Sequence, residues 1–436
     1  MNKVTPRRPS GFPEYLPAEQ IEFKRMISAI ADTYELFGFT PIETPAIELA
    51  EVLLAKGGGE TEKEIYRFSK GEKEYALHYD LTVPLARYVS EHQNNLAMPF
   101  RRYQIQKNWR AERAQKGRFR EFLQCDVDII GSNSVLHDAE IVAVVSEAFA
   151  RLAIGEYIIR ISNRKLLSGF VDAIGLADKA ADVLHLVDKL DKIGKDMLAE
   201  EFGKIGLSSN DTQQVIDFVS MSGTPEEVLE QLEGLSIDNK TFLTGIAEMK
   251  ELLFALKAAN VNPKVYSFDL RIVRGLDYYT GTVYETNLVD YPEFGSVCSG
   301  GRYNDLTKYY SSADLPGVGI SIGLTRLFAA MQEAHKIDSK AASPNKILIA
   351  QFGGKEVLAK ALDVASELRS QKINTQIYLD EAKLDKQFKY ADKLGVPYVL
   401  VIGTAELESG NVVLKDMKSG EQNVISLPEV IKLFKV

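Results

Sequence analysis

The sequence is poor in cysteine, tryptophan and histidine, and it has no long apolar run. Its 436 residues include 2 Cys, 1 Trp and 5 His. Cys125 and Cys298 are too few for a disulfide framework or a multi-thiolate metal site, which fits a reducing compartment. No segment is apolar enough to span a bilayer, and the charged start lacks the apolar core of a signal peptide. We therefore expect a cytoplasmic protein with no membrane partner.

The charge of the chain is acidic but unevenly distributed. The formal net charge is -9, which by itself argues against a nucleic-acid partner. Residues 165–262 hold 9 basic and 17 acidic side chains, a net of -8, and so account for most of this charge. Residues 100–120 hold 8 basic side chains and 1 acidic one. An acidic protein thus contains one strongly positive segment, which is suited to an anionic ligand.

Hydrophobic periodicity divides the chain into parts. Residues 165–262 show helical patterns, for example over 177–190 and 240–256, and no strong strand pattern, which indicates a helical insertion between two β-rich regions. After the polar stretch 336–345, strand and helix patterns alternate, which predicts a compact α/β domain. The predicted parts are a first catalytic part at 1–164, the insertion at 165–262, a second catalytic part at 263–336 and a C-terminal domain at 346–436.

Three segments of the first part alternate between apolar and polar residues, as half-buried strands do. They span residues 78–83, 102–110 and 118–130. Amides, carboxylates and arginines recur on the polar side of all three, so we interpret this side as the floor of a ligand site instead of a solvated sheet face. The polar members are His78, Asp80, Thr82, Gln104, Gln106, Asn108, Arg110, Arg118, Arg120, Phe122, Gln124, Asp126 and Asp128.

Arginines and glycine-rich turns provide candidate phosphate contacts. Arginine suits a triphosphate because its charge is permanent and its planar fork grips two oxygens. A predicted strand turns at Gly323 into a helix whose first turn carries Arg326, a position suited to phosphate. The segment is neither a Walker loop nor a dinucleotide fingerprint. On charge alone, a solvated basic hairpin that pairs with carboxylates elsewhere stays an alternative.

Taken in order, these segments resemble the class II aminoacyl-tRNA synthetases. Residues 38–45 resemble motif 1, at the dimer interface of the family, residues 109–122 resemble motif 2, and residues 323–327 resemble motif 3. The run RGLDYYTGTVYE at 274–285 and the sequence GGRY at 300–303 resemble the two motifs specific to histidyl-tRNA synthetases. The resemblance covers the whole chain. It implies an α+β catalytic domain with an antiparallel sheet, a helical insertion and a C-terminal α/β anticodon-binding domain.

The resemblance also implies a role for individual residues. Arg110 corresponds to the catalytic arginine on the ATP α-phosphate, and Arg326 to the arginine on the γ-phosphate. Glu112 and Phe122 correspond to positions that contact adenine. Arg274 corresponds to a second catalytic arginine, which approaches the α-phosphate from the histidine side. The implied histidine-binding set is Asp80, Thr82, Gln124, Asp128, Arg274, Tyr278 and Tyr279.

The implied reaction joins L-histidine to its cognate tRNA through a histidyl-adenylate, with ATP and Mg²⁺, in a homodimer. The resemblance assigns no protein ligand to the metal. Thr325 departs from the family pattern, because Glu is usual there, and Asn304 stands where an aspartate commonly follows the tyrosine. The alternatives are an inactive histidine-binding regulatory paralogue of the ATP phosphoribosyltransferase type and a class II synthetase for another amino acid. The regulatory paralogue lacks the C-terminal domain, and RGLDYYTG weighs against the other synthetases.

Overall fold

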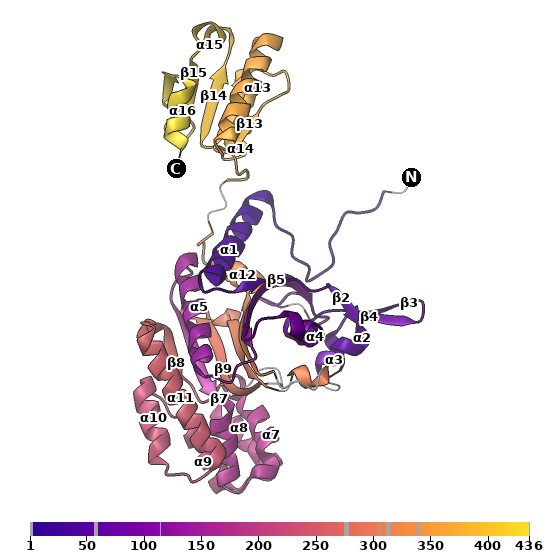
Figure 1. The fold of residues 1–436 in the computed structure, drawn as a ribbon, viewed down its shortest axis with the longest axis vertical. Coiled ribbons are helices and arrows are strands. Elements are labelled where there is room, and N and C mark those ends of the chain that lie inside the picture. Colours follow the sequence, from indigo (N-terminus) through magenta and orange to yellow (C-terminus); the bar gives the residue numbers. More distant parts are fainter. Residues whose placement is uncertain are drawn as a thin grey trace. The chain divides into compact units, whose positions relative to one another are not determined.

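The computed structural model describes residues 3–55, 60–113, 115–273, 279–304, 306–310, 315–337 and 341–435 (Figure 1). The chain forms two compact units. The larger unit contains residues 26–334 together with the N-terminal segment up to Pro13, and the smaller one contains residues 335–436 together with Glu14–Arg25. Helix α1, Pro17–Leu36, contributes to both. Within the described part of the chain, no helix has the length and apolarity needed to cross a membrane.

An eight-stranded sheet forms the centre of the larger unit, in the order β1-β5-β6-β11-β10-β9-β7-β8. Its central strands all pair antiparallel, as predicted, whereas β1 pairs with β5 and β7 with β8 in parallel at the two edges. The strands are β1 Thr40–Pro41, β5 Phe100–Trp109, β6 Glu121–Ile130, β7 Tyr157–Asn163, β8 Tyr266–Phe268, β9 Tyr279–Leu288, β10 Ser296–Tyr303 and β11 Gly317–Gly323.

The apolar side of the sheet packs against helices. Cys125, Val127 and Ile129 of β6 are fully buried, in agreement with the alternation in the sequence. Helices α5, Leu136–Leu152, and α12, Leu324–Glu333, contact these central strands. Thr325 helps to fix α12, because its hydroxyl accepts the backbone N–H of Leu123 at 2.8 Å. The polar residues of β5 and β6 lie on the opposite side, where Gln104, Asn108, Asp126 and Asp128 are buried as well.

The prediction of a strand over residues 78–83 is wrong. Strand β4, Lys73–Leu77, ends before this segment, and helix α4, Thr82–His92, begins within it. A side-chain oxygen of Asp80 accepts the N–H of Val83 at 3.0 Å, which satisfies a free donor of the first helical turn. Pro84 has no N–H and is tolerated in that turn. This local capping outweighs a two-residue alternation that extends over only six positions.

A small sheet and two short helices lie beside α4. The sheet has the order β2-β4-β3, with β2 at Ile47–Leu49 and β3 at Arg67–Lys70. Helices α2 and α3 span Ala50–Leu53 and Glu60–Glu64.

Residues 164–265 leave the large sheet after β7 and return to it as β8, and their regular structure is entirely helical. Figure 1 shows helices α7 to α11 gathered beside these strands. The sequence specifies several of the boundaries: Ser208 with Asp211 and Thr224 with Glu227 form capping boxes at the starts of α9 and α10. The helices are α6 Arg164–Ala173, α7 Ala180–Val187, α8 Leu190–Lys204, α9 Ser209–Val219, α10 Pro225–Gly234 and α11 Lys240–Ala258.

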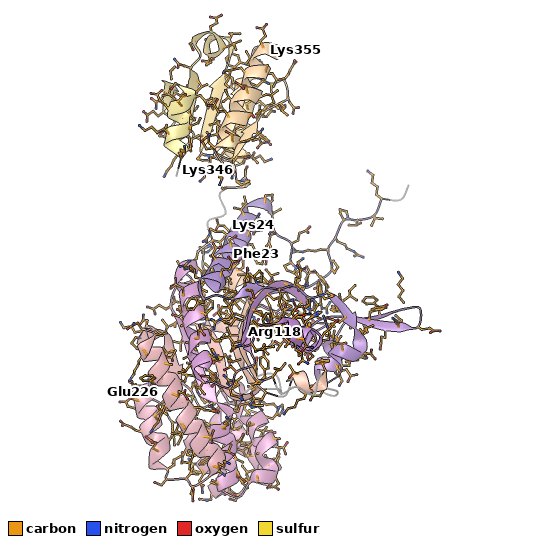
Figure 2. All side chains as sticks on the ribbon, in the orientation of Figure 1. Phe23, Lys24, Arg118, Glu226, Lys346 and Lys355 are labelled. Atoms are coloured by element: carbon orange, nitrogen blue, oxygen red, sulfur yellow. The ribbon has the colours of Figure 1, made fainter. Side chains whose placement is uncertain are left out.

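The smaller unit holds a five-stranded sheet in the order β13-β12-β14-β15-β16. Strands β12, Ile347–Gln351, β13, Thr375–Ile377, and β14, Tyr398–Ile402, pair in parallel. Apolar clusters cover both faces of β12 and β14, which explains why both strands read as continuous apolar runs. Lys346 and Lys355, labelled in Figure 2, mark the start of β12 and of helix α13. The remaining elements are β15 Val412–Asp416, β16 Gln422–Ile425, α13 Lys355–Ser370, α14 Leu384–Lys393, α15 Thr404–Ser409 and α16 Leu427–Phe434.

Candidate functional site

A pocket lies over the polar side of the large sheet. It consists of two overlapping parts with volumes of about 580 and 1310 Å³. Arg118, labelled in Figure 2, belongs to the segment between β5 and β6 that borders both parts. The candidate residues Arg110, Glu112, Gln124 and Arg326 line both parts, although they come from distant points of the sequence.

Strand register assembles the floor of this pocket. Gln104, Asp126, Ser321, Ser299 and Glu285 are paired in succession across strands β5, β6, β11, β10 and β9. We call these five residues the polar row. Because directly paired residues point to the same side of a sheet, the row presents polar groups from five strands to one surface. Four of its members, all except Gln104, line the larger part of the pocket.

The smaller part of the pocket combines an aromatic surface with two arginines. The Arg110 guanidinium lies 5.0 Å from the centre of the Phe122 ring, and its Nε donates to the carbonyl oxygen of Tyr79 at 3.1 Å. Arg326 donates to the carbonyl oxygens of Gly117, at 2.8 Å, and of Ser296. These bonds fix both cations by backbone groups, so the pocket has a positive, preorganised end that suits a phosphate chain.

The larger part carries carboxylates. Asp80, Thr82 and Tyr279 line it together with Gln124, so four of the predicted histidine-binding residues meet here. Burial raises the pKa of Asp80 to about 6, although the N–H of Val83 and the nearby Arg110 oppose this shift. Asp126 also lines this part, and burial raises its pKa to about 7. The end of the pocket away from Phe122 is therefore suited to a cationic group.

Asp128 is not part of the pocket lining. Its carboxylate accepts the Tyr303 hydroxyl at 2.7 Å and lies 2.6 Å from Nη2 of Arg102, which is fully buried. Room for this cluster comes from Gly319, where an added Cβ would lie 2.0 Å from Oδ1 of Asp128. Asp128 thus lies on the same side of the sheet as the polar row, one pair of residues further along β6, and is covered by Arg102 and Tyr303.

A chain of hydrogen bonds runs along the floor. Nδ1 of His78 lies 2.7 Å from Oδ1 of Asn108, whose amide donates to Gln124. Gln124 in turn donates to the Ser321 hydroxyl at 2.6 Å. Burial lowers the pKa of His78, so the ring is neutral and carries its proton on the nitrogen that faces Asn108.

Four residues in or beside the pocket, His78, Arg102, Asp126 and Tyr303, were not among the predicted site residues. The alternation placed His78 and Asp126 on the polar side, and GGRY contains Tyr303, so a signal existed for all three. Arg102 gave no signal beyond its charge, because its pairing with Asp128 depends on strand register. Two predicted residues, Arg274 and Tyr278, lie outside the described residues.

The described residues contain no group of three or more His, Cys, Asp or Glu side chains placed to hold a metal ion. The carboxylates that line the larger part include Glu64 and Glu285. Magnesium is commonly held by one or two carboxylates together with substrate phosphates. The donor set therefore fits a metal that arrives with a nucleotide, and it does not form an all-protein metal site.

Comparisons with known proteins agree with the fold. A family model described as histidyl-tRNA synthetase matches residues 11–327, and one described as an anticodon binding domain matches residues 346–436. The chain is 48% identical to the histidine-tRNA ligase of Clostridium tetani, over 99% of this chain and 98% of that protein. It is 45% identical to the histidine-tRNA ligase of Stenotrophomonas maltophilia, over 97% and 96% of the two chains.

A solved structure gives the same result. The crystal structure of histidyl-tRNA synthetase from Nostoc sp. PCC 7120 superimposes with a TM-score of 0.91 at 38% identity, and the match covers 99% of this chain and 100% of that one. The class II fold predicted from the motifs is thereby confirmed. By its sequence, its domains and its fold, the chain belongs to the histidyl-tRNA synthetase family.

Proposed function

We propose that this chain ligates L-histidine to its cognate tRNA in two steps, through a histidyl-adenylate formed in the pocket on the large sheet. One observation carries this proposal: a single pocket combines two arginines, which line both of its parts, with two buried carboxylates that line only the larger part. ATP presents phosphates, and an amino acid presents an ammonium group. The arginines and the carboxylates therefore match the two substrates in charge.

The nucleotide occupies the smaller part. Arg110 binds the α-phosphate and Arg326 the γ-phosphate, because their guanidinium groups line this part at fixed positions. Phe122 stacks on adenine, and Glu112 contacts its polar edge. The ion pair of Glu112 with Arg118, at 3.2 Å, positions this carboxylate.

Histidine occupies the larger part. Asp80, Thr82, Gln124 and Tyr279 contact it directly, since all four line this part. Asp128 contributes to histidine binding together with the Tyr303 hydroxyl, which donates a hydrogen bond to it. Arg274 and Tyr278 stay predictions, carried by the RGLDYYTGTVYE motif.

In the first step the histidine carboxylate attacks the α-phosphorus of ATP and pyrophosphate leaves. No side chain has to remove a proton, because the attacking carboxylate is already ionised at neutral pH. Both reactants are anions, so the main tasks are to hold them in line and to offset the charge that grows on the phosphoryl oxygens. Arg110 and Arg274 perform this task at the α-phosphate. In the second step the histidyl group passes to the terminal adenosine of the tRNA.

Magnesium enters the site with ATP in this proposal. When bound, it offsets negative charge on the leaving pyrophosphate. Glu64 and Glu285, which line the larger part, would hold it there, and Arg326 would hold the γ-phosphate.

The other predicted properties are proposals with the following support. Residues 346–436 bind the anticodon, since an anticodon binding domain matches them. The domain limits at 164, 262, 336 and 346 rest on hydrophobic periodicity, and the cytoplasmic location rests on the low cysteine content and the lack of a long apolar run. A homodimer joined through residues 38–45 rests on the family resemblance.

Two measurements test this function. ATP and pyrophosphate exchange with each amino acid should proceed with L-histidine only, and aminoacylation of total tRNA should attach histidine only. If the chain were a regulatory paralogue, it would bind histidine but would not catalyse the exchange. This alternative is disfavoured because the curated ligases match nearly the full chain, including the C-terminal domain. Exchange or charging with another amino acid would refute the assignment.

A further inference from the structure

Two buried carboxylates in the larger part of the pocket each have one oxygen that lacks a protein partner. Asp80 and Asp126 are both 3% exposed. Among the described residues, no group forms a hydrogen bond with Oδ2 of Asp80 or with Oδ1 of Asp126. A buried carboxylate oxygen without a donor is costly, so these two atoms mark the position of a ligand donor.

The positive charges nearby do not balance these carboxylates. Arg102 is the buried cation of the floor, and its ion pair is with Asp128. Arg110 lowers the pKa of Asp80, but its own Nε is bonded to the carbonyl oxygen of Tyr79. Burial dominates at Asp80 and Asp126 and raises both pKa values. This end of the pocket therefore has negative charge in excess, which a cationic ligand group would offset.

The hydrogen-bond chain along the floor orients one of these carboxylates. The Ser321 oxygen accepts a hydrogen bond from Gln124, so its own hydrogen is free to point at Asp126, its partner in the strand register. Ser321 hydrogen-bonds with this carboxylate and lowers its pKa, in opposition to burial. The chain from His78 to Ser321 thus ends on Asp126, which lines the pocket and whose Oδ1 has no hydrogen-bond partner among the described residues.

We propose that Asp126 is a further substrate-binding residue, and that its free oxygen, together with that of Asp80, binds the α-ammonium group of histidine. An ammonium group carries three N–H donors and a full positive charge, whereas a neutral imidazole has one donor and one acceptor. Two unpartnered carboxylate oxygens match the ammonium group better. This inference deepens the proposed function and rests on it. Ser321 acts as a positioning residue for Asp126.

The test compares two ligands on two proteins. Asp126→Asn keeps the shape of the side chain and removes its charge. By calorimetry, we expect this variant to bind L-histidine about 10- to 100-fold more weakly than the unchanged protein, since a bond to a charged group is lost. We expect both proteins to bind 3-(imidazol-4-yl)propionate, which lacks the amino group, with affinities within about 2-fold of each other. ATP affinity should not change.

A positioning variant and a matched control complete the experiment. Ser321→Ala should weaken binding of L-histidine and not of the deamino analogue, and Ser321→Thr should restore it. Glu48→Gln neutralises a buried carboxylate that is paired with Arg87 and does not line the pocket, so it should change neither affinity. An equal loss for both ligands in Asp126→Asn, or no loss for either, would overturn the role of Asp126. Absence of histidine binding in the unchanged protein would overturn the proposed function itself.

Discussion

The Tyr303 hydroxyl donates a hydrogen bond to Oδ1 of Asp128 across the intervening strand β11, with 2.7 Å between the oxygens. Tyr303 ends β10 and Asp128 lies on β6, so β11 separates the two residues. The contact passes over Gly317 and Gly319, where any side chain would occupy the space of the phenol ring or the carboxylate. The histidine-specific motif GGRY is thus joined directly to strand β6, next to the polar row.

Removing the Tyr303 hydroxyl should affect histidine and not ATP. Tyr303→Phe leaves a buried carboxylate oxygen without its donor, which costs about 1–3 kcal/mol. We expect the KM for histidine in pyrophosphate exchange to rise about 10-fold and the KM for ATP to stay unchanged. Tyr34→Phe is the matched control, because it removes a buried hydroxyl bonded to the Cys125 carbonyl outside the pocket. Equal effects of the two variants on the KM for histidine would contradict the role given to Tyr303.

Gly319→Ala should disrupt the same cluster sterically. The added Cβ would lie 2.0 Å from Oδ1 of Asp128 and 2.9 Å from the carbonyl oxygen of Val127, and neither group can move freely inside the sheet. We expect the loss of histidine binding together with a lower Tm, measured by calorimetry. Gly234→Ala, at the end of α10 with open space around its Cα, should leave binding unchanged. Normal histidine affinity in Gly319→Ala would show that the cluster is dispensable.

The raised carboxyl pKa values predict opposite pH trends for stability and for binding. Burial raises the pKa of Asp126 to about 7 and of Asp80 to about 6, whereas both groups ionise near their ordinary value in the unfolded chain. At a pH between the ordinary carboxyl pKa and the raised pKa, the folded protein holds more protons than the unfolded chain. The contribution of Asp126 and Asp80 to the free energy of unfolding therefore falls as the pH rises towards 7. Histidine binding needs the ionised forms and should strengthen over the same range.

Scanning calorimetry from pH 5.5 to 8, with and without histidine, measures both trends. Asp126→Asn is the reference, because the free imidazole of histidine also titrates in this range and affects both proteins alike. Relative to this variant, we expect the Tm of the ligand-free protein to fall with pH and the stabilisation by histidine to grow. Identical pH slopes for the two proteins would show that Asp126 does not titrate in this window.

Arg302 of the GGRY motif should be needed for stability. It is 4% exposed, and it donates to the Asp138 carboxylate and to the carbonyl oxygens of Ser132 and Ser134, which ties β10 to α5. Asp138→Ala leaves this buried cation without its carboxylate and should cost about 3–5 kcal/mol of unfolding free energy. The exposed pair of Arg151 with Glu147 is the comparison, and Glu147→Ala should cost less than about 1 kcal/mol. Similar losses of unfolding free energy in the two variants would contradict this role.

The fold could be predicted where periodicity and motifs extend over many residues. The alternating segment 118–130 forms the ten-residue strand β6, and α11 begins at the residue predicted from its pattern. The segment 78–83 failed because six alternating residues match a helix start as well as a strand, and the capping contact of Asp80 decides between them.

The sequence predicted which residue types form the candidate site, but it did not predict where each residue lies relative to the pocket. The alternation put Asp126 and Asp128 on one side of β6, and the structure keeps them there, but Arg102 and Tyr303 pair with Asp128, whereas Asp126 lines the pocket. Such differences arise from partners on other strands, which a single sequence does not align. Tyr303 and His78 were missed for the same reason, since their contacts join residues distant along the chain.

The return of the chain from β7 to β8 has a consequence for the order of folding. These strands are parallel neighbours at the edge of the sheet, yet residues 164–265 separate them in the sequence. The pairing of Ile159 with Tyr266 therefore closes a long loop. A loop of this length costs entropy to close, and helices that form first shorten the distance between its ends. We therefore expect this edge of the catalytic sheet to form late in folding, because the pairing of β8 depends on the helical insertion. A mutation that destabilises the insertion would therefore impair formation of the sheet that carries the candidate site.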